Sequence, residues 1–144
     1  MKKNVILLIL IVSVFSACKE INNSSTPINE SSVSGVWKAK EFESTIPDIP
    51  EEYLEAGKKE FLSSVYTLNQ DNTLEVRSDY FREGARGHWE LDVEKKELSM
   101  FYEMDTIKGV ETYNILELSS KAMTLRQEMT EVNAYVQITL EKKK

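Results

Sequence analysis

The sequence has very few of the side chains that most often carry covalent or acid–base chemistry. Its 144 residues include one cysteine and one histidine. A lone cysteine excludes an intramolecular disulfide, so an apolar core must hold the folded part together. The histidine, His88, falls beside a predicted turn and on the outward side of a strand. No Ser/His or Cys/His pair remains, so we expect a protein that is not an enzyme and needs no cofactor.

Metal ligands and positive charge are scarce as well. His88, Glu90 and Asp92 alternate along one predicted strand, so consecutive ones stand about 7 Å apart, which favours a solvated face over a metal site. The chain carries 18 lysines and arginines against 24 aspartates and glutamates, for a net charge of −6. It offers no basic surface for a phosphate backbone, and we expect no nucleic acid partner.

Long apolar runs are missing too, and the longest one stands near the N-terminus. The stretch from Val5 to Phe15 is far shorter than the ~20 residues that a membrane-spanning helix needs. Lys2 and Lys3 precede it, and a short apolar run behind basic residues is typical of a signal peptide. The only cysteine, Cys18, comes directly after this run and two small residues.

The segment Phe15-Ser16-Ala17-Cys18 resembles the bacterial lipobox, in which the cysteine receives a diacylglyceryl group and signal peptidase II cuts before it. The resemblance implies a signal peptide at residues 1–17 and lipidation of Cys18, so that acyl chains hold the protein on a membrane. Lys19 stands where an aspartate would resemble an inner-membrane retention signal. The expected location is therefore the outer membrane of the cell envelope, on either face. The alternative is an ordinary secretory signal followed by an unmodified cysteine.

The segment after the cysteine is polar. Residues 19–33 read KEINNSSTPINESSV and contain almost no large apolar side chains. Such a composition cannot bury enough surface to offset the entropy lost on ordering the chain. We therefore expect a lipidated cysteine and flexible tether at residues 18–33, and one folded domain at residues 34–144.

From Gly35 onward, apolar and polar residues alternate with a period of two, which is typical of half-buried strands. One helical stretch is predicted at residues 49–62, where Asp48 and Glu51 have the spacing of a capping box. Short turns connect the strands into consecutive hairpins. We predict an all-β fold, an eight-stranded antiparallel up-and-down barrel with one short helix between strands 1 and 2, because closure removes both exposed sheet edges. The predicted strands are 35–43, 64–69, 73–80, 86–92, 97–104, 110–118, 122–130 and 134–142.

Two tryptophan motifs bear on the family. Gly35-Val36-Trp37 opens the first predicted strand, and Gly87-His88-Trp89 lies in the fourth. Together with the hairpin sequence at residues 66–74, they resemble the Gly-x-Trp strands of lipocalins and of lipocalin-like domains in lipoproteins of Bacteroidota. The resemblance covers residues 34–142 and implies a lipocalin-like barrel. The lipocalin pattern also implies an arginine over the first tryptophan, whereas the last predicted strand has no arginine and Arg126 lies at outward parity.

Candidate ligand-binding residues follow from the predicted register of three strands. A hairpin centred on Ile107 and a two-residue turn at Ser119-Ser120 place Tyr102, Thr112 and Gln127 in one inward row. The row is either a self-satisfied hydrogen-bond network or the set of polar groups that orients a ligand in an apolar cavity. A single β-bulge would reverse the parity beyond it. The predicted ligand-binding set is Tyr102, Thr112, Asn114 and Gln127, with the flexible Met100 and Met123.

The same register predicts a row of residues on the outer face of the barrel. A lipid-anchored carrier would bind a small hydrophobic molecule in the interior, with the helix at residues 49–62 as a lid. A rigid interaction module would have a filled barrel and would dock another envelope protein through the outer row. An interior cavity of ~300 Å³ or more would favour the carrier. The predicted partner surface is Phe101, Tyr113, Ile115 and Arg126.

Overall fold

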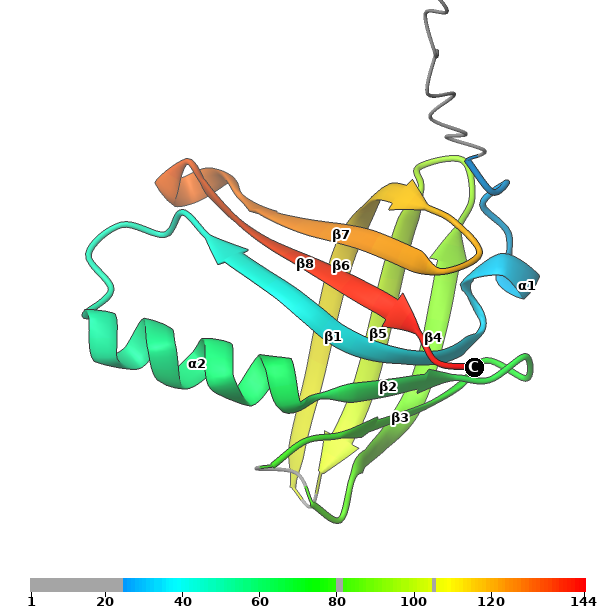
Figure 1. Cartoon of the computed structure of the whole chain (residues 1–144), viewed down its shortest axis with the longest axis horizontal. Helices are drawn as coiled ribbons and strands as arrows, with labels where there is room; N and C mark the ends of the chain where they lie inside the picture. The colour runs from blue at the N-terminus through cyan, green and yellow to red at the C-terminus, as the bar shows by residue number, and fades with distance from the viewer. Residues whose placement is uncertain (1–24, 80–81, 105) are drawn as a thin grey trace, which may run out of the picture.

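The structure is a computed structural model that describes residues 25–79, 82–104 and 106–144. Eight antiparallel strands form one closed barrel, in which each strand pairs with the next along the chain and β8 pairs with β1 (Figure 1). The predicted up-and-down barrel, with a helix between its first two strands, is confirmed. The elements are α1 (Glu30–Val33), β1 (Gly35–Ser44), α2 (Glu51–Ser63), β2 (Val65–Leu68), β3 (Thr73–Arg77), β4 (Ala85–Asp92), β5 (Glu97–Met104), β6 (Ile107–Leu118), β7 (Ala122–Met129), η1 (Thr130–Val132) and β8 (Ala134–Lys142).

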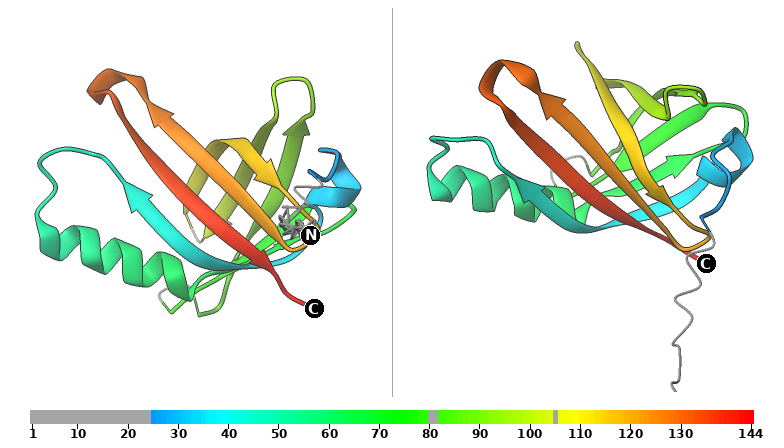
Figure 2. Two further views of the ribbon diagram at one scale, coloured as in Figure 1. Left: turned by 45° about the horizontal axis from the view of Figure 1, so that its top comes forward. Right: turned by 90° about the horizontal axis from the view of Figure 1, so that it is seen from above.

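The barrel has two unlike ends (Figures 1 and 2). The closed end holds α1, the turns after β2, β4 and β6, and the C-terminus, whereas the open end holds α2 and the η1 turn. At the closed end the Thr26 amide donates to the Leu118 carbonyl at 3.0 Å, and the Lys143 amide donates to the Val36 carbonyl at 2.8 Å. The described chain therefore enters and leaves the barrel at the same end.

Two tryptophans fill the closed end. Trp37 and Trp89 are fully buried. The indole Nε1–H of Trp37 donates to the Val33 carbonyl at 2.8 Å, and that of Trp89 donates to the Asn69 carbonyl at 3.0 Å. Both buried indoles thus find their partners in backbone at this end, as large aromatic donors require. Lys142 of β8 lies over the Trp37 ring, with Nζ 4.9 Å from the ring centroid, so the last strand supplies a lysine at the place where an arginine was expected.

The segment before β1 packs on the barrel. Asn29 caps α1 through a capping box with Ser32. Val33 is fully buried, and Ile28 packs against the core. The predicted tether at residues 18–33 is therefore wrong over residues 26–33, because two apolar side chains that are isolated in the sequence are covered by the barrel. Residues 18–24 of that prediction lie outside the described residues.

Helix α2 lies beside the open end of β1 (Figure 1). Its Phe61 packs against Phe42 of β1 and Tyr66 of β2, with ring centroids 5.5 Å and 6.3 Å apart. No residue of α2 is fully buried. The helix therefore covers part of the open end through partly buried aromatic contacts instead of through a continuous apolar face.

Over most of the length of strand β6, the side chains that point into the barrel are those that were predicted to point outward. Only residues 105 and 106 separate it from β5, and Tyr102 pairs with Gly109 instead of Thr112. This shift of three residues turns the other face of β6 inward, because side chains alternate with a period of two. An extra residue, Leu116, bulges between the pairs that β6 makes with β7 and reverses the parity again near the closed end.

Candidate functional site at the open end of the barrel interior

The inward side chains of β5 to β8 change from fully to partly buried toward one end of the barrel. Toward the closed end and the middle, these inward residues are at most 6% exposed: Leu98, Met100, Tyr113, Ile115, Met123, Leu125, Ile138 and Leu140. The next inward residue toward the open end is half-buried on each strand, namely Tyr102, Glu111, Gln127 and Val136. The interior is therefore packed over its closed half and reached by solvent at its open end.

Glu111 is the charged residue of this open half. It pairs across the sheet with Met100, which pairs in turn with the buried Trp89. Its carboxylate accepts two hydrogen bonds, one from the Tyr102 hydroxyl to Oε1 at 3.0 Å and one from the Tyr113 hydroxyl to Oε2 at 3.1 Å. Tyr66, which is 7% exposed, is close enough for the Glu111 charge to act on its hydroxyl. We call Tyr66, Tyr102, Glu111 and Tyr113 the Glu111 cluster.

Two glycines fix the position of the Tyr102 ring. Tyr102 pairs with Gly87 on one side and Gly109 on the other. A Cβ added at Gly109 would collide with the Tyr102 ring, which therefore lies over this glycine. A Cβ added at Gly87 would collide with the Phe101 carbonyl. The two glycines let the strands and the ring approach closely, and the ring then presents its hydroxyl to Glu111.

The electrostatics of the cluster follow from burial and from one charge. Burial, and then the Glu111 charge, raises the pKa of Tyr102 to about 12. The same two causes, in the same order, raise the pKa of Tyr66 and of Tyr113 well above the usual tyrosine range. All three phenols are therefore neutral donors at neutral pH, and the carboxylate is the charge that they surround.

The Glu111 carboxylate lacks a basic partner within the described part of the chain. None of the ion pairs formed there includes Glu111. The lysine on the inward side of β8, Lys142, sits at the opposite end of the barrel over Trp37. Two hydroxyl donors thus satisfy the carboxylate by hydrogen bonding without neutralising it.

The structure brings together only part of the predicted ligand-binding set. Met100 and Met123 point inward and are fully buried, and Tyr102 and Gln127 occupy inward positions at the open half. The predicted inward positions of Thr112 and Asn114 are wrong. The shifted register puts the exposed Thr112 on the outer face, where its Oγ1 lies 2.9 Å from Ser99 Oγ, and Asn114 follows on the same face beside Arg126.

The predicted partner surface is divided in the same way. Tyr113 and Ile115 are buried in the interior, at 6% and 3% exposure, so their predicted outward positions are wrong for the same reason of register. Phe101 does face outward, where its ring stacks on His88 with centroids 4.5 Å apart. Arg126 also faces outward, and its guanidinium lies 4.2 Å above the Tyr135 ring. The two remaining residues therefore belong to separate contacts and not to one apolar ridge.

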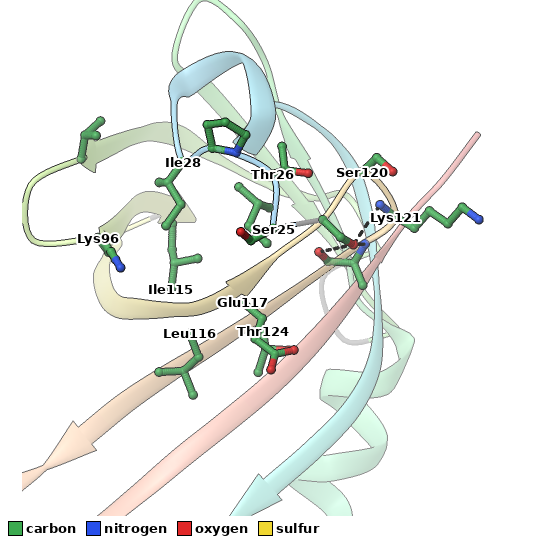
Figure 3. Close-up of a pocket in the computed structure, with 15 residues that line it drawn as sticks. Ser25, Thr26, Ile28, Lys96, Ile115, Leu116, Glu117, Ser120, Lys121 and Thr124 are labelled. Carbon is green, nitrogen blue, oxygen red and sulfur yellow. Dashed lines mark hydrogen bonds between the residues drawn. The ribbon is translucent and has the colours of Figure 1, made fainter. Parts of the chain in front are cut away.

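A hollow of about 940 Å³ lies outside the packed interior, at the closed end (Figure 3). It is bounded by the N-terminal segment at residues 25–28, by the end of β6 with its bulge, and by the turn after β6. Leu116 and Thr124 line it from the outer side of the barrel, and Lys121 from the turn. No member of the Glu111 cluster lines it, whereas the buried Ile115 and Leu118 do, so it is a hollow of the closed end that is separate from the open half.

Sequence reasoning missed Glu111 and Tyr66 as members of a site. Glu111 alternates correctly with Tyr113 and Ile115, and this pattern would have indicated an inward carboxylate had the turn been placed at residues 105–106. Within residues 25–79, 82–104 and 106–144, no group of His, Cys, Asp and Glu is placed to hold a metal ion. None of the helices in these ranges is long and apolar enough to cross a membrane. No family model matches the sequence, and no curated protein matches it.

Proposed function

We propose that this protein is a lipid-anchored lipoprotein of the cell envelope whose lipocalin-like barrel binds a small, largely apolar ligand at the open end of its interior. One observation carries the ligand-binding part of the proposal. On four successive strands, β5 to β8, the inward side chains change from fully buried to half-buried toward the open end. Polar groups and partly exposed apolar walls above a packed floor are the kinds of side chain that line small-ligand sites.

The walls above this floor support a mostly apolar ligand. Val136 of β8 and Phe42 of β1 are half-buried on the inward face, and Phe61 of α2 packs beside Phe42. Tyr102 and Gln127 supply the polar groups that would orient the ligand. Neither the fully buried Met100 nor the fully buried Met123 is reached by solvent, so both support the floor from below.

The anchor and the site would lie at opposite ends of the barrel. Ser25 is the first described residue and belongs to the closed end, where Thr26 bonds to Leu118. Ser25 lies seven residues after Cys18, and a fully extended chain of seven residue steps spans at most about 25 Å. Acyl chains on Cys18 would therefore hold the closed end within about 25 Å of the membrane surface and leave the open end facing the aqueous phase.

The anchor is tested by metabolic labelling with a radioactive or clickable fatty acid. The parent chain should incorporate label, whereas the variant Cys18→Ser should give an unlabelled precursor. Substitution of the nearby Ser24→Ala is a matched control, since it should leave labelling unchanged. Equal labelling of the parent and of Cys18→Ser would refute the lipoprotein assignment.

The ligand is tested by native mass spectrometry of the full chain purified from the organism that encodes it. The parent should retain a small molecule of defined mass, and Val136→Trp, which fills the open half, should lose it. Tyr135→Phe on the outer face of the same strand is the control and should keep it. Retention by Val136→Trp, or no retained molecule in the parent, would contradict binding in the open half.

A second function, a rigid interaction module without a ligand, is favoured by the hollow of about 940 Å³ at the closed end. This hollow faces the outside of the barrel and combines an exposed apolar residue, Leu116, with the flanking Lys121. Under this reading Leu116→Arg would abolish cross-linking of the anchored protein to one envelope partner. Under the ligand-binding reading the same change would leave the retained molecule in place.

A further inference from the structure

Glu111 is a carboxylate inside the barrel, and no cation lies beside it among the described residues. This indicates which class of ligand the open end would bind. A charge removed from water is costly unless it is hydrogen-bonded and paired. Tyr102 and Tyr113 supply the hydrogen bonds, at 3.0 Å and 3.1 Å, but both hydroxyls are neutral. The protein therefore supplies hydrogen-bond donors to the carboxylate but no positive charge that would neutralise it.

The surroundings of the carboxylate would favour a cation over a neutral group. Tyr102 and Tyr113 reach Glu111 through their hydroxyl oxygens, whose lone pairs can also accept a hydrogen bond from an ammonium group. The half-buried position of Glu111 makes the carboxylate reachable from the open end. The net charge of −6 adds a long-range field that draws cations toward the protein.

The other side chains of the open half set the rest of the ligand. Besides Glu111, the half-buried inward side chains are Tyr102, Gln127 and Val136, with Phe42 of β1, and all of these except Gln127 are aromatic or aliphatic. A polar body would find few partners among them, whereas an apolar body would bury surface against them. The ligand that matches both features has one positive charge at one end and an apolar remainder.

We propose that the open end binds an organic ammonium ion, with its nitrogen at the Glu111 carboxylate and its apolar part between Tyr102 and Val136. This inference rests on the proposed ligand-binding function and narrows it to a class of ligand. The ammonium group donates to carboxylate lone pairs that the tyrosine hydroxyls leave free, because each carboxylate oxygen can accept more than one hydrogen bond. Glu111 supplies charge recognition, and the tyrosines hold the carboxylate in place.

Two probes of the same carbon skeleton test the charge. The 2-phenylethylammonium ion and 2-phenylethanol differ in charge but share the ring and the ethyl spacer. Binding to the full chain in a zwitterionic detergent is followed by calorimetry and by tryptophan fluorescence, to which Trp89 contributes from a position two strands from Glu111 through Met100. The parent should bind the ammonium ion at least about tenfold more tightly than the alcohol, which corresponds to ~1.4 kcal/mol.

Three variants assign the preference to Glu111. In Glu111→Gln the ratio of the two affinities should fall to near one, whereas Glu111→Asp, which keeps the charge, should retain a preference for the ammonium ion. Glu117→Gln is the matched control, because Glu117 is on the same strand, is exposed and faces outward. Thermal melts of all three confirm folding. Loss of the preference in Glu117→Gln, or its survival in Glu111→Gln, would overturn the inference.

The outcomes of these experiments also distinguish failure of this inference from failure of the proposed function. Equal binding of both probes to the parent would refute the ammonium class and leave a ligand site in the open half. A neutral molecule retained in native mass spectrometry, lost in Val136→Trp and not displaced by the ammonium probe, would do the same. Absence of any retained molecule together with absence of probe binding would overturn both proposals.

Discussion

The two halves of the barrel interior are built from the same alternating strands but differ in the packing and the solvent exposure of their inward side chains. In the closed half, Trp37 and Trp89 fill the space and donate their indole protons to backbone carbonyls of the adjoining segments. In the open half, the Glu111 carboxylate and Tyr102 occupy half-buried inward positions, and Glu111 also accepts a hydrogen bond from the buried Tyr113. The closed half therefore provides most of the apolar stabilisation, and the open half can exchange contacts with another molecule.

The difference arises from side-chain size along each strand. Inward residues of the closed half are large and apolar, and an eight-stranded barrel leaves room only for such side chains or for one small ligand. The open half includes Gly87 and Gly109 on either side of Tyr102, and neither glycine fills interior space. The Tyr102 ring covers Gly109, so one half-buried ring fills the interior beside these two strands, where the closed half has several buried side chains.

The largest expected effect on the free energy of unfolding comes from truncating one inward side chain in each half of the barrel. Trp89→Ala should lower the free energy of unfolding by about 3–5 kcal/mol, because it removes a fully buried ring and leaves a cavity. Tyr102→Ala should cost less, since its ring is half-buried and water can enter the space. Urea denaturation of both variants measures the difference. Equal losses would show that the open half is packed as tightly as the closed half.

The next largest effect on stability is expected at alkaline pH, because the tyrosines of the Glu111 cluster have raised pKa values. Burial, followed by the Glu111 charge, raises the pKa of Tyr66 and Tyr113 above the usual range. The unfolded chain loses these protons near the ordinary pKa of 10.0, whereas the folded chain keeps them. Stability is therefore fully present below about pH 10 and falls above it, by up to ~1.4 kcal/mol per pH unit for each such tyrosine.

Thermal melts between pH 9 and pH 12, combined with phenolate absorbance, check this prediction. For Tyr102 the loss should end near its pKa of about 12. Glu111→Gln is the informative variant, since removal of the nearby charge lowers the folded-state pKa of Tyr102 and should make the Tyr102 part of the decline end at a lower pH. A melting temperature that stays constant across this interval would contradict the burial of the cluster.

The fold was predictable because its signals are local. Apolar alternation and turn residues placed all eight strands, with every boundary within three residues of the observed one. Asn72 shows why the turn chemistry was sufficient. Its φ of 65° is left-handed, a conformation that asparagine tolerates, so the turn forms although glycine is absent there.

The site was only partly predictable because it depends on register. Along β6 both faces carry mixtures of polar and apolar residues, for example Thr112 and Val110 on one face and Glu111 and Ile115 on the other. Alternation alone therefore cannot decide which face turns inward. The position of a two-residue turn and the bulge at Leu116 decide it, and neither has a distinctive sequence.

Two glycine substitutions compare a backbone neighbour with a side-chain neighbour. Gly87→Ala should destabilise the protein by about 2 kcal/mol or more, because the new methyl group would meet the Phe101 carbonyl, which the β4–β5 ladder holds in place. Gly109→Ala should cost less, because the Tyr102 ring that it meets can rotate toward solvent. Urea denaturation ranks the two, and the reverse order would contradict the described packing around Tyr102.

Removal of single hydroxyls compares the two hydrogen bonds to Glu111. Tyr113→Phe should cost about 1.5 kcal/mol, since its hydroxyl is buried and donates to a charged acceptor. Tyr102→Phe should cost clearly less, because water can replace a half-buried donor. The comparison uses thermal or urea unfolding at neutral pH. If Tyr102→Phe proves the more damaging change, the carboxylate is shielded from the open end and not reached through it.

The smallest effect concerns the cation at the closed end. Lys142→Met keeps most of the side chain that covers Trp37 and removes its charge, so it should lower stability by about 0.5–1 kcal/mol, the usual strength of a cation–π contact at an accessible site. Lys143→Met, at the exposed neighbouring position, is the control and should leave unfolding unchanged. Differential scanning calorimetry resolves a change of this size. If the Lys142→Met protein is as stable as the parent, the packing of the Trp37 indole and its hydrogen bond to Val33 stabilise the closed end without a contribution from the charge. Lys142 would then stabilise the closed end only through the apolar contacts of its side chain with the ring.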